Sequence, residues 1–160
     1  IKRFKIILEP SKRNTAPAIL SSALINDIPN QQPLIFLAAD HLIEKESSFN
    51  KALKINQKNL TKNNIFIFGI KPTSPSSEFG YFLTKKIKKL NLVSRFIEKP
   101  NLTKAKKIIQ NDGYWNSGMF FLRKDSLVSN FKKYQKKIFN CCSLAVKKSK
   151  YKKQKLNGTH

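Results

Sequence analysis

The 160-residue chain carries 32 basic and nine acidic residues, which gives a formal net charge of +23. Hydrophobic residues make up 40% of it, a composition typical of globular rather than fibrous or disordered proteins. Its length fits one domain or part of a larger one and excludes a multidomain enzyme. It has no apolar run near the roughly 20 residues of a membrane-spanning helix and no secretory signal at its start. We therefore expect a soluble, cytoplasmic protein with no membrane partner.

The positive charge has two explanations. A basic surface is typical of proteins that bind nucleic acids or anionic membranes. However, lysine outnumbers arginine 28 to 4, as expected when an AT-rich genome places lysine at tolerant surface positions. Arginine reads base edges better, and the lysines are not interleaved with aromatic residues as on a base-stacking surface. Composition bias is favoured, so no specific nucleic acid partner is expected, and a basic non-enzymatic nucleic-acid-binding protein is kept as the alternative.

The first half of the chain alternates between apolar runs typical of buried strands and amphipathic stretches typical of helices. Strands are predicted at 4–8, 34–38 and 65–70, and helices are predicted to be capped by Thr15 and by Ser47 or Ser48. This alternation predicts an α/β fold with right-handed crossovers, a mainly parallel sheet and ligand binding at the carboxyl ends of the strands. We expect the three strands to be buried neighbours.

The second half is less regular. Two short strands at 81–83 and 93–97 separated by a lysine-rich connection, a helix at 103–110 that ends before Gly113, and a strand at 118–122 are predicted. From Lys124 onward the pattern is helical. We place the end of the domain at residue 145 and expect residues 146–160 to form a lysine-rich, frayed tail.

Three acidic residues stand at the ends of predicted strands, where an open α/β sheet has its ligand crevice. They are Glu9, Asp40 and Glu98. Each of them alone could simply accept hydrogen bonds in a turn. Residues 13–15, however, follow Glu9 at the start of a predicted helix and add polar side chains and free helix amides in the same place. A carboxylate is the natural acceptor for the N1–H and N2–H donors of a guanine edge.

Five segments together resemble the bacterial mannose-1-phosphate guanylyltransferases. In order they are EPSKRNTAPAI at 9–19, LAADH at 37–41, FGIKPTSP at 68–75, FIEKP at 96–100 and YWNSGMFF at 114–121. RNTAPAI and WNSGMF are long enough to be specific, and related sugar nucleotidyltransferases lack RNTAPAI. The resemblance extends from about Ile7 to Leu144 and implies a partial nucleotidyltransferase domain over residues 1–145.

The resemblance implies both a fold and a reaction. The fold would be α/β, of the Rossmann-like nucleotide-diphospho-sugar transferase type, with a mainly parallel sheet, helices on both faces and truncation at both ends. The mannose 1-phosphate oxygen would attack the α-phosphorus of GTP in line, giving GDP-mannose and pyrophosphate without a protein nucleophile. Catalysis would consist of positioning and charge neutralisation, with Mg²⁺ as the cofactor. Self-association into a homo-oligomer is compatible with this interpretation.

The resemblance also implies roles for individual residues. The nucleotide-binding residues would be Glu9, Arg13, Asn14, Thr15 and Ala16. The sugar-binding residues would be Gly80, Glu98, Lys99, Asn116 and Gly118. Asp40 would ligate Mg²⁺, and Asp40 and Lys99 would be the catalytic residues, with Lys99 holding the incoming phosphate. We expect one crevice to be lined by Glu9, Asn14, Asp40, Glu98, Lys99 and Asn116.

The chain also departs from the family that it resembles. It begins after the glycine-rich loop whose Arg and Lys grip the triphosphate, and it ends before the Asp that supplies a second metal carboxylate. We therefore expect a fragment with little or no activity by itself. The family's sugar loop corresponds to residues 76–81, with Glu78 in place of a glycine that accepts φ > 0, which puts the loop conformation in question. Trp115 is interpreted as a core residue, and Lys99 outside its motif would simply be one solvated lysine among 28.

Overall fold

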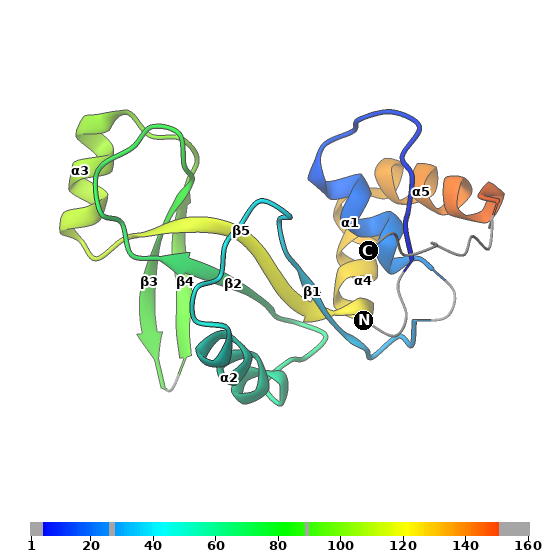
Figure 1. Ribbon diagram of the computed structural model, residues 1–160, viewed down its shortest axis with the longest axis horizontal. Coiled ribbons are helices and arrows are strands. Elements are labelled where there is room, and N and C mark those ends of the chain that lie inside the picture. The colour runs from blue at the N-terminus through cyan, green and yellow to red at the C-terminus, as the bar shows by residue number, and fades with distance from the viewer. Residues whose placement is uncertain (1–4, 26–27, 89, 151–160) are drawn as a thin grey trace, which may run out of the picture. The chain divides into compact units, whose positions relative to one another are not determined.

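The computed structural model describes residues 5–25, 28–88 and 90–150 and divides the chain into two compact units (Figure 1). Unit 1 comprises Ile1–Pro33, Thr61–Asn63 and Arg123–His160, and unit 2 comprises Leu34–Leu60 and Asn64–Leu122. The elements are α1 (Thr15–Ala23), β1 (Pro33–Phe36), α2 (Glu46–Gln57), β2 (Ile65–Ile70), β3 (Tyr81–Ile87), β4 (Leu90–Ile97), α3 (Leu102–Gln110), β5 (Tyr114–Arg123), α4 (Lys124–Tyr134) and α5 (Lys136–Lys148). None of the described helices has the length and apolar character needed to cross a membrane.

The strands form a sheet with the order β1-β5-β3-β4, and β2 also pairs with β5. The β2–β5, β3–β4 and β3–β5 pairs are antiparallel, so the predicted mainly parallel sheet is wrong. β3 and β4 are joined by a tight turn at Lys88, where φ is 55°, and strands joined in this way run in opposite directions. β1 and β2 both pair with β5 rather than with each other, because a strand from later in the chain lies between them.

The buried strand predicted at 4–8 is also wrong over its described residues, 5–8. These residues belong to no strand, and Ile6 and Leu8 are 68% and 86% exposed. Phe4 lies outside the described residues. An apolar run becomes a strand only where a neighbouring strand supplies hydrogen-bond partners. No strand in the described part of the chain pairs with this run.

The helices predicted in the first half are present, but their predicted caps are wrong. Thr15 is the first residue of α1, and Asn14 occupies the N-cap position without a capping hydrogen bond from its side chain. α2 begins at Glu46, so Ser47 and Ser48 lie inside the helix. A carboxylate in the first turn is favourable there because it faces the positive end of the helix dipole.

The core of unit 1 lies between α1, α4 and α5. Leu20 of α1, Leu127 of α4 and Cys142 of α5 are buried, whereas the neighbouring Cys141 is exposed. At the start of α4, the Nε atom of Arg123 donates to Oδ1 of Asp125 at 3.0 Å, and this bond holds the Asp125 pKa below its ordinary value. α5 continues to Lys148, and residues 151–160 of the predicted tail lie outside the described residues.

The core of unit 2 lies where α3 covers one face of β3 and its neighbours (Figure 1). Tyr81, Ile97, Ala105 and Ile108 form a buried cluster, and Trp115 packs against it as expected of a core residue. Both β3 and β4 are longer than predicted, because the lysine-rich segment between them continues the antiparallel ladder up to the turn.

α3 ends before Gly113, as predicted. The N–H of Asp112 donates to the carbonyl of Ile109 at 3.0 Å, and the N–H of Gly113 donates to the carbonyl of Ile108 at 3.0 Å. Asp112 has a φ of 53°. These two bonds and the left-handed residue form a Schellman motif, which pairs the last carbonyls of the helix.

Gly113→Ala is expected to lower the free energy of unfolding by about 1–3 kcal/mol. A Cβ at this position would lie 2.7 Å from the Ile108 carbonyl oxygen, a backbone atom that cannot move without opening the helix end. Urea denaturation followed by circular dichroism measures the change. Lys106→Ala, at an exposed position of α3, is the control, and equal stabilities of the two variants would contradict the prediction.

Candidate functional site

Three of the predicted sugar-binding residues meet at one point of unit 2. Gly80 directly precedes β3, Glu98 directly follows β4, and Asn116 lies within β5. The N–H of Asn116 donates to the Gly80 carbonyl at 2.7 Å. A Cβ added to Gly80 would lie 2.8 Å from Oε2 of Glu98 and 3.7 Å from Cβ of Asn116. We call Gly80, Glu98 and Asn116 the Gly80 cluster.

The register of the sheet explains why these residues meet. Tyr81 pairs with Ile97 on one side and with Trp115 on the other. The residue before Tyr81 therefore faces the residue after Ile97, and both lie beside the residue after Trp115. The missing side chain of Gly80 keeps the Glu98 carboxylate and the nearby backbone open to a ligand. A carboxylate acceptor beside an amide suits the hydroxyl groups of a small polar ligand.

A bulge in β5 fixes the side chain of Asn116. Two steps along β2, from Ile67 to Gly69, correspond to four steps along β5, from Phe120 to Asn116. Within this bulge Gly118 has a φ of 72°, and its N–H donates to Oδ1 of Asn116 at 3.2 Å. The bond holds the oxygen of the amide and leaves Nδ2 as the donor group. Bulges of this kind often redirect a side chain next to a binding site.

Backbone strain marks two further predicted residues. Among the described residues, four non-glycine residues have a positive φ: Asn14, Lys88, Lys99 and Asp112. Lys88 lies in a hairpin turn and Asp112 at a helix end, where such values are ordinary. Lys99 has a φ of 39° directly before the buried Pro100, and Asn14 has a φ of 65° with a ψ of −178°, a region populated almost only by glycine. Strain of this kind clusters at functional sites, so it supports both residues independently of the sequence motifs.

The predicted nucleotide-binding residues lie in unit 1, at and before the start of α1. Glu9, Arg13, Asn14 and Thr15 are exposed, and Ala16 is partly exposed. Because the Asn14 side chain makes no capping hydrogen bond, it is available to a ligand together with the helix amides that follow it. Glu98 and Asn116 come together in unit 2, whereas the expectation that all six crevice residues line one site stays a prediction.

Asp40 lies in an exposed turn that follows β1, and the adjacent His41 is exposed as well. Within the described part of the chain, no group of three or more His, Cys, Asp or Glu side chains is placed to hold a metal ion. A single carboxylate fits Mg²⁺ only when substrate phosphates and water supply the other ligands, which is the usual manner of Mg²⁺ binding in enzymes that use nucleotides. The donor set therefore fits an ion that arrives with a nucleotide.

The loop before Gly80 accepts Glu78 without strain. Glu78 is not among the described residues with a positive φ, and its N–H donates to Oγ of Ser76 at 3.1 Å. Glu78 can therefore replace the family's glycine here without adopting a left-handed backbone conformation. Sequence reasoning missed Tyr81, whose buried hydroxyl also bonds to Ser76. No sequence signal marks this role, because the partners of the hydroxyl are backbone atoms.

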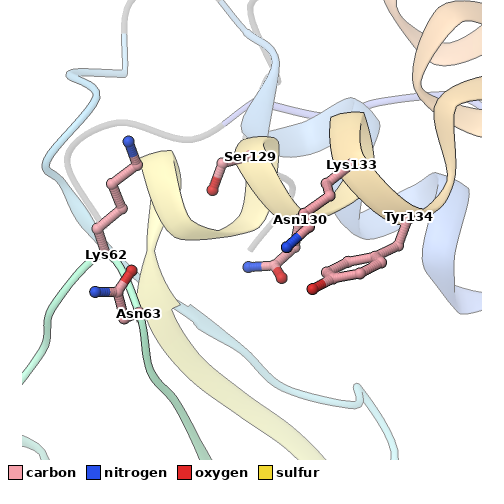
Figure 2. Close-up of a pocket in the computed structure, with 6 residues that line it drawn as sticks. All are labelled: Lys62, Asn63, Ser129, Asn130, Lys133 and Tyr134. Carbon is pink, nitrogen blue, oxygen red and sulfur yellow. The ribbon is translucent and has the colours of Figure 1, made fainter.

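A pocket of about 280 Å³ lies elsewhere, in unit 1 (Figure 2). It is lined by Lys62, Asn63, Ser129, Asn130, Lys133 and Tyr134, none of which is a predicted site residue. Figure 2 shows the side chains of Lys62 and Asn63 extending in different directions. Ser129 and Asn130 donate to the Ser126 carbonyl at 3.0 and 2.8 Å, so these donors already serve α4. Two of the donors that line the pocket are therefore already paired within α4.

Comparisons with known proteins identify the family to which the chain is similar. Residues 2–159 match the family model described as "Nucleotidyl transferase". The chain is 39% identical over 156 residues to the mannose-1-phosphate guanylyltransferase of Escherichia coli, covering 91% of this chain and 34% of that protein. It is 36% identical over 147 residues to the xanthan biosynthesis protein XanB of Xanthomonas campestris pv. campestris strain B100, covering 91% of this chain and 32% of that protein.

A likeness in fold accompanies the likeness in sequence. A crystal structure from Thermus thermophilus, described as a mannose-1-phosphate geranyltransferase, has a TM-score of 0.78 to this chain at 24% identity. The alignment covers 90% of this chain and 43% of that one. The chain spans about a third of the length of the two curated relatives above.

The strain at Asn14 predicts opposite effects for two substitutions. Asn14→Gly should raise the free energy of unfolding by about 1 kcal/mol, because glycine adopts this backbone conformation without strain. Asn14→Ala should lower it by about 1 kcal/mol, because alanine keeps the strain and tolerates the left-handed region less well than asparagine. Thermal and urea unfolding measure both. Equal stability of the two variants would show that the strain is absent.

Proposed function

This chain belongs to the nucleotidyl transferase family, and from that premise we propose that it is part of a mannose-1-phosphate guanylyltransferase. The enzyme would convert GTP and mannose 1-phosphate into GDP-mannose and pyrophosphate. The carrying observation is the Gly80 cluster, in which residues from three separate motifs meet around one glycine. The names of the Escherichia coli and Xanthomonas relatives support the substrates and extend the proposal to polysaccharide formation.

The Gly80 cluster would hold the sugar. The carboxylate of Glu98 would accept hydrogen bonds from sugar hydroxyls, and Nδ2 of Asn116 would donate one. Gly80 would let the ring approach the backbone, and Lys99 would place its ammonium group on the phosphate of mannose 1-phosphate. The strained backbone at Lys99 supports this role, because it fixes where the lysine side chain starts.

The start of α1 would hold the nucleotide. The Glu9 carboxylate would accept the N1–H and N2–H groups of guanine, and Arg13, Asn14 and the first helix amides would donate to the nucleotide. Asp40 would hold Mg²⁺, which when bound supplies charge neutralisation at the α-phosphate. Because the attacking group is an oxygen of the substrate, the protein's own contribution is to position the two substrates and neutralise their charge.

A basic nucleic-acid-binding protein is not favoured as the alternative. The family match spans nearly the whole chain, and three of the motif residues, Gly80, Glu98 and Asn116, meet in unit 2. The two functions differ in their response to salt. Binding to a nucleic acid backbone weakens steeply with salt, whereas a guanine pocket retains its preference for GTP over ATP. Calorimetric titrations with GTP, ATP and duplex DNA at two salt concentrations separate them.

Glu9→Gln should abolish most of the preference for GTP over ATP. The amide that replaces the carboxylate carries a donor where guanine presents donors, which costs roughly tenfold or more in GTP affinity. Glu44→Gln, at an exposed position outside the motifs, is the matched control. If Glu9→Gln and Glu44→Gln bind GTP equally, the assignment of Glu9 to the base is wrong.

Gly80→Ala should weaken mannose 1-phosphate binding roughly tenfold while changing the free energy of unfolding by less than about 1 kcal/mol. The new methyl group would lie against the end of the Glu98 side chain. This side chain can rotate away, which avoids the clash but removes its hydrogen bonds to the sugar. Binding is followed by the fluorescence of Trp115, the single tryptophan of the chain. Ser77→Ala, in the same exposed loop, is the control. Unchanged binding in Gly80→Ala would contradict the proposed sugar site.

A further inference from the structure

The loop that leads to Gly80 is closed on itself by Tyr81. The Tyr81 hydroxyl accepts a hydrogen bond from the N–H of Ser76 at 3.0 Å and donates one to the carbonyl of the same residue at 3.0 Å. The Tyr81 side chain is fully buried, so its hydroxyl has no access to water as an alternative partner. One side chain thus fixes both backbone groups of a residue that lies five positions earlier.

An aromatic contact fastens the same loop at a second point. The ring centroid of Phe79 lies 4.9 Å from that of Trp115, and Trp115 lies 6.5 Å from Tyr81 in an edge-on arrangement. The Trp115 Nε1 atom is buried and has no hydrogen-bond partner within the described part of the chain. The Phe79 side chain is 46% exposed, so it lies at the surface of this contact.

The side chains that hold the loop, Tyr81 and Phe79, lie on the opposite face of the sheet from the Gly80 cluster. Successive residues of a strand point to opposite faces, and Tyr81 points toward α3 with Ile97 and Trp115. Gly80 therefore presents its open side to the other face, where an added Cβ would meet Glu98 and Phe96. The groups that hold the loop do not occupy the space in which a ligand would lie.

We propose that Tyr81 is a positioning residue that holds the Gly80 backbone in place for the sugar from the reverse face of the sheet. The identity of the ligand as a sugar rests on the proposed function, whereas the effect of Tyr81 on the Gly80 backbone does not. Without the hydroxyl, the loop spends part of its time in other conformations. The apparent affinity for a ligand falls in proportion to the fraction of molecules that have the competent conformation.

Tyr81→Phe tests the proposal, with Tyr114→Phe as the matched control. Both variants remove one hydroxyl group and keep the ring, and Tyr114 lies in β5 stacked on Phe82 at 5.8 Å. The first readout is hydrogen exchange of the Asn116 amide, which bonds to the Gly80 carbonyl. The second is the dissociation constant for mannose 1-phosphate, followed by Trp115 fluorescence.

In Tyr81→Phe we expect the Asn116 amide to exchange roughly tenfold faster and mannose 1-phosphate to bind roughly tenfold more weakly, the size expected when about two modest hydrogen bonds are lost. Tyr114→Phe should change neither value. The amide of Ala105, which bonds to the carbonyl of Asn101 at the start of α3, is the internal reference. Equal acceleration at Ala105 would mean general destabilisation and would overturn the proposal.

Two other results are also decisive. Unchanged exchange at Asn116 would show that Tyr81 does not hold the Gly80 backbone. Faster exchange with unchanged affinity would show that the backbone position does not matter for the sugar. If the unmodified chain does not bind mannose 1-phosphate, the proposed function fails, and the exchange rates alone still decide whether Tyr81 fixes the backbone.

Discussion

The pairing of Tyr81 with both Ile97 and Trp115 is the constraint on which the candidate site depends. These pairs bring together segments that are 16 and 34 positions from Tyr81 in the sequence. Because side chains alternate along each strand, one register sets two surfaces at once. One face carries Tyr81, Trp115 and the contact with α3, and the opposite face carries the Gly80 cluster. A shift by one residue would exchange the two faces, so core packing also protects the geometry of the site.

The sequence predicted the kind of fold and the local elements better than their arrangement. The family match and the likeness in fold confirm an α/β nucleotidyltransferase fold. β2 and α3 lie close to where their patterns place them, and the helical pattern from Lys124 onward corresponds to α4 and α5. The parallel order failed because hydrophobic periodicity indicates which segments tend to form strands and not which strand lies beside which. β5 follows both β1 and β2 in the chain and lies between them, an arrangement that no local pattern encodes.

For the candidate site, too, the sequence predicted some residues and not others. The family resemblance implied that Gly80, Glu98 and Asn116 bind the sugar, and the structure brings these three residues together. The strain at Asn14 and Lys99 was not predictable, since asparagine commonly caps helices and a residue before proline is expected to be extended. Tyr81 was missed for another reason. Its partners are backbone atoms of Ser76, and backbone atoms leave no signature in a sequence.

The loop at 71–80 shows how an open glycine can be kept in a fixed position. Glycine leaves room for a ligand but gives up the side-chain contacts that would anchor its own backbone, and it has the most conformational freedom to lose on folding. Pro72 and Pro75 restrict the unfolded loop, which lowers the entropy cost of ordering it. Tyr81 and Phe79, the next large side chains on either side of Gly80, then anchor the chain on the face opposite the Gly80 cluster. Rigidity is thus supplied by the neighbours of the glycine, because any anchor on the glycine itself would fill the space that the ligand needs.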